Sequence, residues 1–166
     1  MYRTIEDFIK VWKYESESTA KTLKYLTDSA LPTKVTEEGR SLGFLAWHIV
    51  LTLGEMGGHM GVIVNAPPEN SEEPKDAEKI VLAYEIAAMS LEVEVQSKWN
   101  DAMLLEVIEM YGEKWRRGDA LSSLIRHEIH HRAQMTVLMR QAGLKVPGIY
   151  GPAKEEWADI GMPAQR

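Results

Sequence analysis

The sequence of 166 residues predicts an all-α protein, a single domain over residues 1–166 built as a four-helix bundle. Over most of the chain apolar residues recur every three to four positions, which is the period of an amphipathic helix. No segment shows a convincing alternation of apolar and polar residues, the pattern of a half-buried strand. Four long helices without strands bury their apolar faces best by packing against one another.

The first two helices are predicted from their apolar residues, and the first also from its cap. Thr4 is a good N-cap for the first helix, which should end before Leu31-Pro32. Its stripe consists of Ile5, Phe8, Ile9, Trp12, Thr19, Leu23 and Leu26. The second helix should begin near Ser41, and we expect its C-terminal end to be weakened by Gly57, Gly58 and Gly61.

The second half of the chain predicts two more long helices and a short one. The composition of residues 65–74 is typical of turns and linkers. A long helix should follow from about Asp76 to Trp99. A short helix is expected from Asp101 to Met110, where Tyr111-Gly112 ends it.

The fourth long helix should be capped by Asp119 and run from Ala120 to about Ala142, with Gly143 just beyond its end. The connections before the third and fourth helices are about 17 and about 20 residues long, enough to permit a crossover. A simple up-down-up-down order therefore does not follow from the sequence.

Composition excludes several classes of protein. The 25 acidic and 19 basic residues give a formal charge of −6, unlike the basic footprint of a nucleic-acid-binding protein. The absence of cysteine excludes disulfides, thiolate metal sites and a cysteine nucleophile, so any reacting thiol must come from a co-substrate. Without an apolar signal region at Met1–Thr4 or a membrane-spanning apolar run, we expect a cytoplasmic protein that does not enter a membrane.

The fourth predicted helix contains three of the five histidines in a stretch of five residues: His127, His130 and His131. His127 and His131 are four residues apart, so both lie on the apolar face, about 6 Å apart along the axis. A single histidine on a core face is usually just a hydrogen-bonded core residue, but two stacked imidazoles are well placed to bind one metal ion. His130 points away from most of this face, so we expect it at the surface or in contact with a ligand residue.

His48 is the best candidate for a third ligand because it lies on the apolar face of the second helix. His59 has a similar position around the helix axis but lies about 16 Å further along a continuous helix, so His48 and His59 cannot bind the same ion. We expect His59 to be a solvated residue near the fraying helix end. Three imidazoles with an open fourth position are typical of catalytic metal sites.

Two neighbouring polar residues have alternative interpretations. Gln134 lies beside the histidine pair and could hold a ligand or a bound substrate, or be an ordinary interfacial amide. Glu128 is a candidate catalytic residue as a general base on metal-bound water, or else an ion-pair partner for Arg132. Arg126 and Arg132 are expected on a solvated face or at an interface.

These residues resemble the DinB/YfiT-like superfamily of metal-binding four-helix bundles. The resemblance rests on His48 within residues 45–48, on the run 126–135, and on the tail 140–152. Ala133 is a departure, because the family often has glycine there.

The resemblance implies an up-down-down-up bundle, a homodimer, and a divalent ion held by His48, His127 and His131. Some relatives are thiol-dependent enzymes, including bacillithiol S-transferases and a mycothiol-dependent maleylpyruvate isomerase. Zinc and nickel are the first candidates for the ion, and imidazole ligands also suit iron and copper.

Three functions remain open from the sequence. The leading one is a metal-dependent enzyme that transfers a low-molecular-weight thiol of the bacillithiol type to an electrophilic small molecule. The second is a zincin-like hydrolase, suggested by the His-Glu-x-x-His pattern, which would use Glu128 as base and Glu155 or Glu156 as third ligand. The third is a stress-response metal-binding bundle without enzymatic activity.

Overall fold

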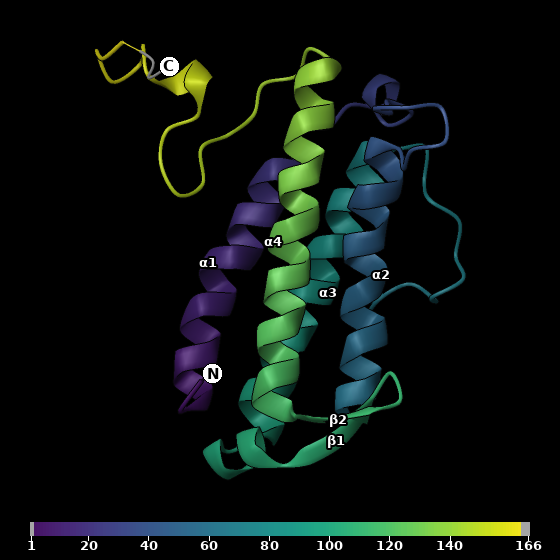
Figure 1. Ribbon diagram of the computed structural model, residues 1–166, viewed down its shortest axis with the longest axis vertical. Helices are drawn as coiled ribbons and strands as arrows, with labels where there is room; N and C mark the ends of the chain where they lie inside the picture. Colours follow the sequence, from purple (N-terminus) through teal and green to yellow (C-terminus); the bar gives the residue numbers. More distant parts are fainter. Residues whose placement is uncertain (1, 164–166) are drawn as a thin grey trace.

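A computed structural model describes residues 2–163 and confirms a bundle of four long helices, with a small two-stranded sheet added at one end (Figure 1). The long helices are α1 (Ile5–Leu23), α2 (Leu42–Met60), α3 (Ala77–Lys98) and α4 (Arg117–Gln141). Short 3₁₀ helices span Asp28–Ala30, Asp101–Leu105 and Lys154–Glu156. Over residues 2–163 we find no helix with both the length and the apolar character needed to cross a membrane.

Most of the bundle interior is apolar, and all four helices contribute to it. Its largest fully buried side chains include Trp12 of α1, Leu53 of α2, Tyr84 of α3 and Leu121 of α4. The Trp12 indole N–H donates a hydrogen bond to the carbonyl of Ala88, which satisfies its polar atom inside the core.

Side-chain caps begin three of the long helices, and the predicted cap Thr4 is one of them. The Thr4 hydroxyl accepts a hydrogen bond from the backbone N–H of Asp7, whose carboxylate in turn accepts from the Thr4 N–H, completing a capping box. The side chains of Ser41 and Asp76 cap α2 and α3 by accepting from the backbone N–H of Phe44 and Lys79. These caps depend on residues within one turn, which is why they can be predicted from sequence.

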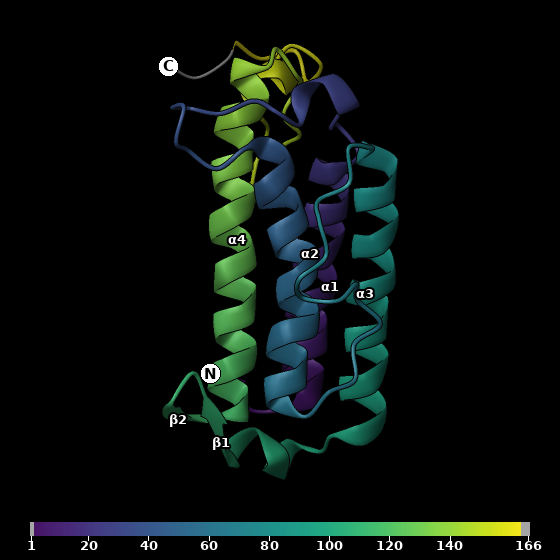
Figure 2. The same ribbon diagram turned by 90° about the vertical axis from the view of Figure 1, so that its right-hand side faces the viewer.

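The helices do not simply alternate in direction. Two ion pairs join α1 to α3, Lys13–Glu92 at 3.3 Å and Lys24–Glu85 at 2.7 Å. Because residue numbers rise along α1 while those of the partners fall along α3, the two helices are antiparallel. Figures 1 and 2 show α2 running in the same direction as α3, and α4 in the same direction as α1. The connection between α2 and α3 travels back along the length of the bundle. As a result α2 and α4 pack antiparallel.

The prediction of a helix over residues 101–110 was wrong in its second half. Strands β1 (Val107–Met110) and β2 (Glu113–Arg116) form an antiparallel hairpin. Tyr111 and Gly112 between them have φ values of 53° and 79°, as a two-residue type I′ turn requires. Tyrosine is an uncommon residue at a positive φ, so the turn gave no recognisable sequence signal.

The start of the fourth helix was also predicted too late. β2 leads directly into α4 at Arg117, and Asp119 lies in the first turn instead of capping it. The backbone N–H of Arg117 donates to the carbonyl of Glu106, which joins the helix start to the hairpin. Gly118 fits closely beneath this contact, because an added Cβ would lie 3.2 Å from the Leu104 carbonyl oxygen.

The expected weakening at the end of the second helix is absent, and His59 is a helical residue. α2 continues to Met60 and ends at Gly61, whose φ of 77° is left-handed. Gly57 is required by packing, since an added Cβ would lie 2.5 Å from a methyl carbon of Val64. The His59 ring lies exposed, 5.1 Å from the ring of Tyr111.

Candidate metal centre

Three histidine side chains from two helices converge on one point. The Nε2 atom of His127 lies 3.1 Å from Nε2 of His48 and 3.1 Å from Nε2 of His131. One possible ligand atom from each of the three lies within 4.8 Å of the others. Among residues 2–163 no other histidine or carboxylate joins this group. The structure therefore brings together the three residues that the sequence singled out.

Two of these rings are neighbours on one helix, and the third is brought to them by the packing of α2 against α4. His127 and His131 are one turn apart on α4, with ring centroids separated by 4.3 Å. His48 comes from the antiparallel α2, and Phe44, one turn before it, stacks on its ring at 5.9 Å with an interplanar angle of 15°. His131 is only 6% exposed, whereas His48 and His127 are half-buried, so the site opens towards the surface.

Burial keeps the three imidazoles uncharged. It lowers the pKa of His48 and His131 below the usual value, and it lowers the pKa of His127 to about 4, with the neighbouring histidines adding to the effect. The positive charge of Arg40 contributes to the lowered pKa of all three. A metal ion needs neutral imidazole with a free lone pair, and at neutral pH these rings offer it.

Hydrogen bonding among the rings does not explain the arrangement. The Nδ1–H of His131 donates to Oε1 of Gln134 at 2.8 Å, which leaves its Nε2 as an acceptor only. Nε2 of His127 faces two other Nε2 atoms but carries at most one hydrogen, so it cannot form two well-aligned hydrogen bonds. A central cation would use all three lone pairs. Ligand nitrogens of a tetrahedral zinc ion are roughly 3.4 Å apart, close to the spacing here.

Gln134 connects the site to the exposed His130. Its Oε1 accepts from His131, and its Nε2 lies 3.1 Å from Nε2 of His130. Of the two interpretations of Gln134, this geometry supports the one in which its side chain orients a ligand. Such partners fix the tautomer and the orientation of a ligating ring.

Replacing Gln134 by leucine should weaken metal binding about 10- to 100-fold, because His131 loses the acceptor that fixes its tautomer. Gln134→Glu keeps an acceptor and should retain most of the affinity. Competition against a chromophoric chelator measures the affinities. Gln141→Leu is the control, since Gln141 is also exposed but lies in the last turn of α4. Equal affinities for Gln134→Leu and Gln141→Leu would show that the contact has no influence on the metal.

Glu128 does not face the histidines. Its Oε1 accepts hydrogen bonds from the hydroxyls of Thr19 at 2.6 Å and Tyr84 at 2.7 Å, on α1 and α3. The side chain is 1% exposed, and burial raises the pKa of this carboxyl to about 7. Its Oε2 has no hydrogen-bond partner among the described residues. The carboxylate is therefore directed away from the position that a base on metal-bound water would need.

The two downstream glutamates lie in separate contacts of their own. Glu155 forms an ion pair with Arg140 at 3.3 Å. Glu156 accepts hydrogen bonds from the backbone N–H groups of Gly148 and Ala153. Neither belongs to the histidine group, so the third ligand that a zincin-like site would need is not supplied from this segment.

Arg132 was expected on a solvated face or at an interface, and the structure contradicts this. Its guanidinium is buried, with Nη2 2.6 Å from a carboxylate oxygen of Glu15. The same guanidinium donates to Thr19 and to the hydroxyl of Tyr150 in the C-terminal tail. No local pattern indicates this pair, because its members are 117 positions apart in the sequence.

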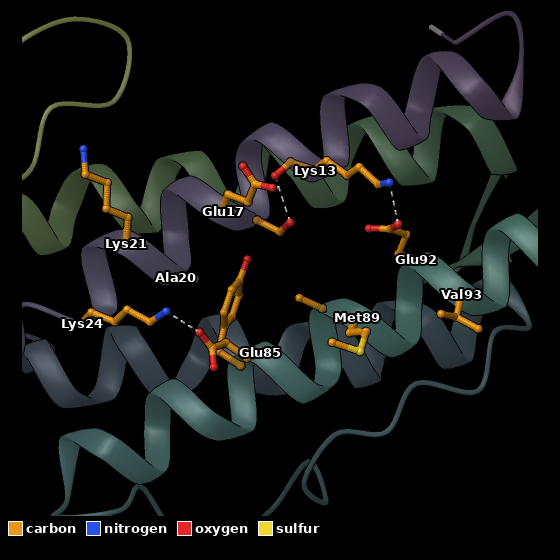
Figure 3. A pocket seen from close by; sticks show the side chains of 12 residues that line it. Lys13, Glu17, Ala20, Lys21, Lys24, Glu85, Met89, Glu92 and Val93 are labelled. Atoms are coloured by element: carbon orange, nitrogen blue, oxygen red, sulfur yellow. Dashed lines mark hydrogen bonds and ion pairs between the residues drawn. The ribbon is translucent and has the colours of Figure 1, made fainter.

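A large surface cavity lies away from the histidines. It measures about 860 Å³ and lies between α1 and α3 (Figure 3). Two ion pairs cross it, Lys13 with Glu92 and Lys24 with Glu85. A smaller cavity of about 390 Å³ includes His48 in its wall, together with Phe44, Trp47 and Leu51. This second cavity therefore lies against one of the three histidines.

Comparison with known proteins agrees with the fold. The model of the DinB family matches residues 1–166. A Bacillus subtilis protein, the uncharacterized protein YrdA, is 42% identical over 166 residues, which cover 100% of this chain and 99% of that protein. A solved DinB-like protein from Bacillus cereus is 39% identical with a TM-score of 0.87, covering 90% of this chain and 100% of the other.

A second solved DinB-like protein, YjoA from Bacillus subtilis, is 17% identical with a TM-score of 0.67, over 86% of this chain and 96% of that one. At this identity the likeness concerns the fold alone. The match over the full length, together with the close relatives, shows that this chain belongs to the DinB family.

Proposed function

We propose that the chain is a metal-dependent enzyme whose divalent ion, zinc or nickel before iron or copper, is held by His48, His127 and His131. The observation that carries this is the convergence of the three Nε2 atoms, with His127 3.1 Å from both of the others. When bound, such an ion supplies a Lewis acid that lowers the pKa of a thiol or water in its open position. The residues present fit this role, because all three imidazoles are neutral and the Gln134 amide, by accepting from Nδ1–H of His131, leaves its Nε2 free for the ion.

The reaction that we propose is transfer of a low-molecular-weight thiol, of the bacillithiol type, to an electrophilic small molecule. The chain has no cysteine, so a thiol nucleophile would have to be borrowed. The cavity of about 390 Å³ beside His48 is of a size that suits a small molecule. Phe44, Trp47 and Leu51 form the apolar part of its wall beside His48, and the remainder is polar, with the carboxylates of Glu55, Glu69 and Glu73.

The test begins with cobalt-loaded protein, whose absorption reports the ligands of the ion. Bacillithiol or glutathione should change the spectrum by replacing a bound water. Monochlorobimane can then serve as the electrophile, with the conjugate measured by fluorescence. A spectrum that no thiol perturbs would contradict the proposed reaction. Stoichiometric metal without any thiol binding would favour the non-enzymatic stress-response bundle.

No observation favours the zincin-like hydrolase. Glu128 is engaged by Thr19 and Tyr84, and Glu155 by Arg140. For a hydrolase of this kind both carboxylates would need to be near the histidines.

We also propose that the protein forms a homodimer through the exposed face of α3. Four large apolar side chains on this helix are solvent-exposed: Leu82 at 57%, Ile86 at 41%, Met89 at 68% and Val93 at 55%. Their spacing of four, three and four residues places them in one stripe. A second copy packed antiparallel about a two-fold axis would pair Leu82 with Val93 and Ile86 with Met89. Such a self-complementary patch is what a two-fold interface requires.

Met89→Glu is therefore expected to convert a dimer into a monomer, because it would bury two carboxylates beside apolar side chains. Sedimentation velocity over a range of concentrations measures the change. Ile63→Glu provides the control, since Ile63 is 77% exposed but lies outside α3. A wild-type protein that stays monomeric throughout the range would refute the proposed interface.

A further inference from the structure

A stack of three side chains connects an arginine to the histidine site. The Cζ atom of Arg40 lies 5.0 Å from the centre of the Phe44 ring, and the Phe44 ring in turn stacks on His48 at 5.9 Å. Phe44 and His48 are one turn apart on the same face of α2, and Arg40 lies in the loop just before the Ser41 cap. Cation–π contact holds the guanidinium near the site although the arginine itself is exposed.

This arginine has no anionic partner within residues 2–163. No carboxylate oxygen lies within 4.0 Å of it, and its N–H groups make no hydrogen bond to the described residues. Its charge nevertheless acts on the site, since it helps to lower the pKa of His48, His127 and His131. The guanidinium therefore adds an uncompensated positive charge beside three neutral imidazoles.

Arg40 also lines a cavity that lies beside the histidine site. The cavity measures about 460 Å³ and is formed by the loop before α2, by α2 and by α4. Its apolar wall consists of Val35, Leu45, Val137 and Leu138. Gln134 lines it as well, and the same amide accepts the hydrogen bond from His131. The cavity thus has an apolar interior, one cation and one amide in contact with a histidine of the site.

We propose that this cavity binds the carboxylate-bearing end of the thiol substrate, with Arg40 as its anion-binding residue. The inference rests on the proposed function and narrows its substrate class to thiols that carry an anionic group. A guanidinium presents paired N–H donors that match the two oxygens of a carboxylate. The apolar wall suits the short carbon chain between the carboxylate and the sulfur.

The experiment compares two thiols of similar size on cobalt-loaded protein. 3-Mercaptopropionate carries a carboxylate, and 2-mercaptoethanol carries a hydroxyl in its place. In the parent protein both should change the cobalt absorption. Arg40→Gln should weaken binding of 3-mercaptopropionate about tenfold and change that of 2-mercaptoethanol by less than about twofold. Arg40→Lys should retain part of the affinity for 3-mercaptopropionate, because the positive charge remains but the paired N–H donors of the guanidinium are lost.

Arg116→Gln is the matched control for net charge. Arg116 is exposed at the end of β2 and forms no ion pair among the described residues. It should leave the affinity for both thiols unchanged, which separates a direct contact from general electrostatic attraction.

Three results would overturn the inference. Arg40→Gln could leave both affinities unchanged, in which case the anion binds elsewhere or belongs to the electrophile. It could weaken both thiols equally, or alter the cobalt spectrum without thiol, and either result would assign Arg40 a structural role. Failure of both thiols to bind the parent protein would instead count against the proposed function itself, so the two failures can be distinguished.

Discussion

Replacing His127 by alanine is expected to lower the affinity for divalent metal by more than about a hundredfold. Loss of a partner that only orients a ligand already costs 10- to 100-fold, and loss of the ligand itself should cost more. His127 is the central member of the group, because its Nε2 lies 3.1 Å from both of the others. Elemental analysis after purification without chelators measures the effect. The parent should hold about one equivalent, and the variant less than roughly a tenth.

His130→Ala and His59→Ala are the matched controls for this experiment. His130 is an exposed neighbour on the same helix, and His59 lies on the other helix of the site. Both variants should keep the metal of the parent. His127→Gln preserves more of the side-chain volume and should lose metal as His127→Ala does. Agreement between the two variants would show that the loss of metal does not come from a folding defect. Metal below a tenth of an equivalent in the parent would remove the basis of the proposed function.

Replacing Arg132 by methionine is expected to lower the free energy of unfolding by about 3–5 kcal/mol. The change leaves the carboxylate of Glu15 buried without its cationic partner, and a buried charge without compensation is costly. It also removes the hydrogen bonds that Arg132 donates to Thr19 and Tyr150, so the C-terminal tail loses one of its attachments to the bundle. Denaturant unfolding followed by circular dichroism measures the difference.

Arg140→Met is the control for this prediction, on the same helix and also in an ion pair. Arg140 and Glu155 are both solvent-accessible, so breaking their contact should cost no more than about 1 kcal/mol. Adding Glu15→Gln to Arg132→Met should restore part of the lost stability, because the unpaired charge is removed. Equal destabilisation by Arg132→Met and Arg140→Met would mean that the buried pair contributes no more than a surface one.

The sequence predicted most of the helical architecture because the signals for helices are local. Thr4, Ser41 and Asp76 cap their helices through hydrogen bonds to residues three positions later. Where the prediction failed, contacts beyond a single helical turn or an unusual turn residue decided the outcome. The end of α2 is stabilised by packing of Gly57 against Val64, and the start of α4 by a hydrogen bond from Arg117 to Glu106. The hairpin between α3 and α4 was missed because Tyr111 is an unusual residue for its turn.

Part of the candidate site could likewise be predicted from local sequence, and part could not. That His127 and His131 share one helix face follows from their spacing alone, and the absence of cysteine follows from composition. Periodicity indicates which residues share a face of one helix, but it does not specify which helix covers that face. Only the tertiary structure brings His48 to His127 across 79 positions, directs Glu128 to Thr19 across 109, and buries Arg132 against Glu15 across 117. These contacts depend on the directions and packing of whole helices, which no local pattern encodes.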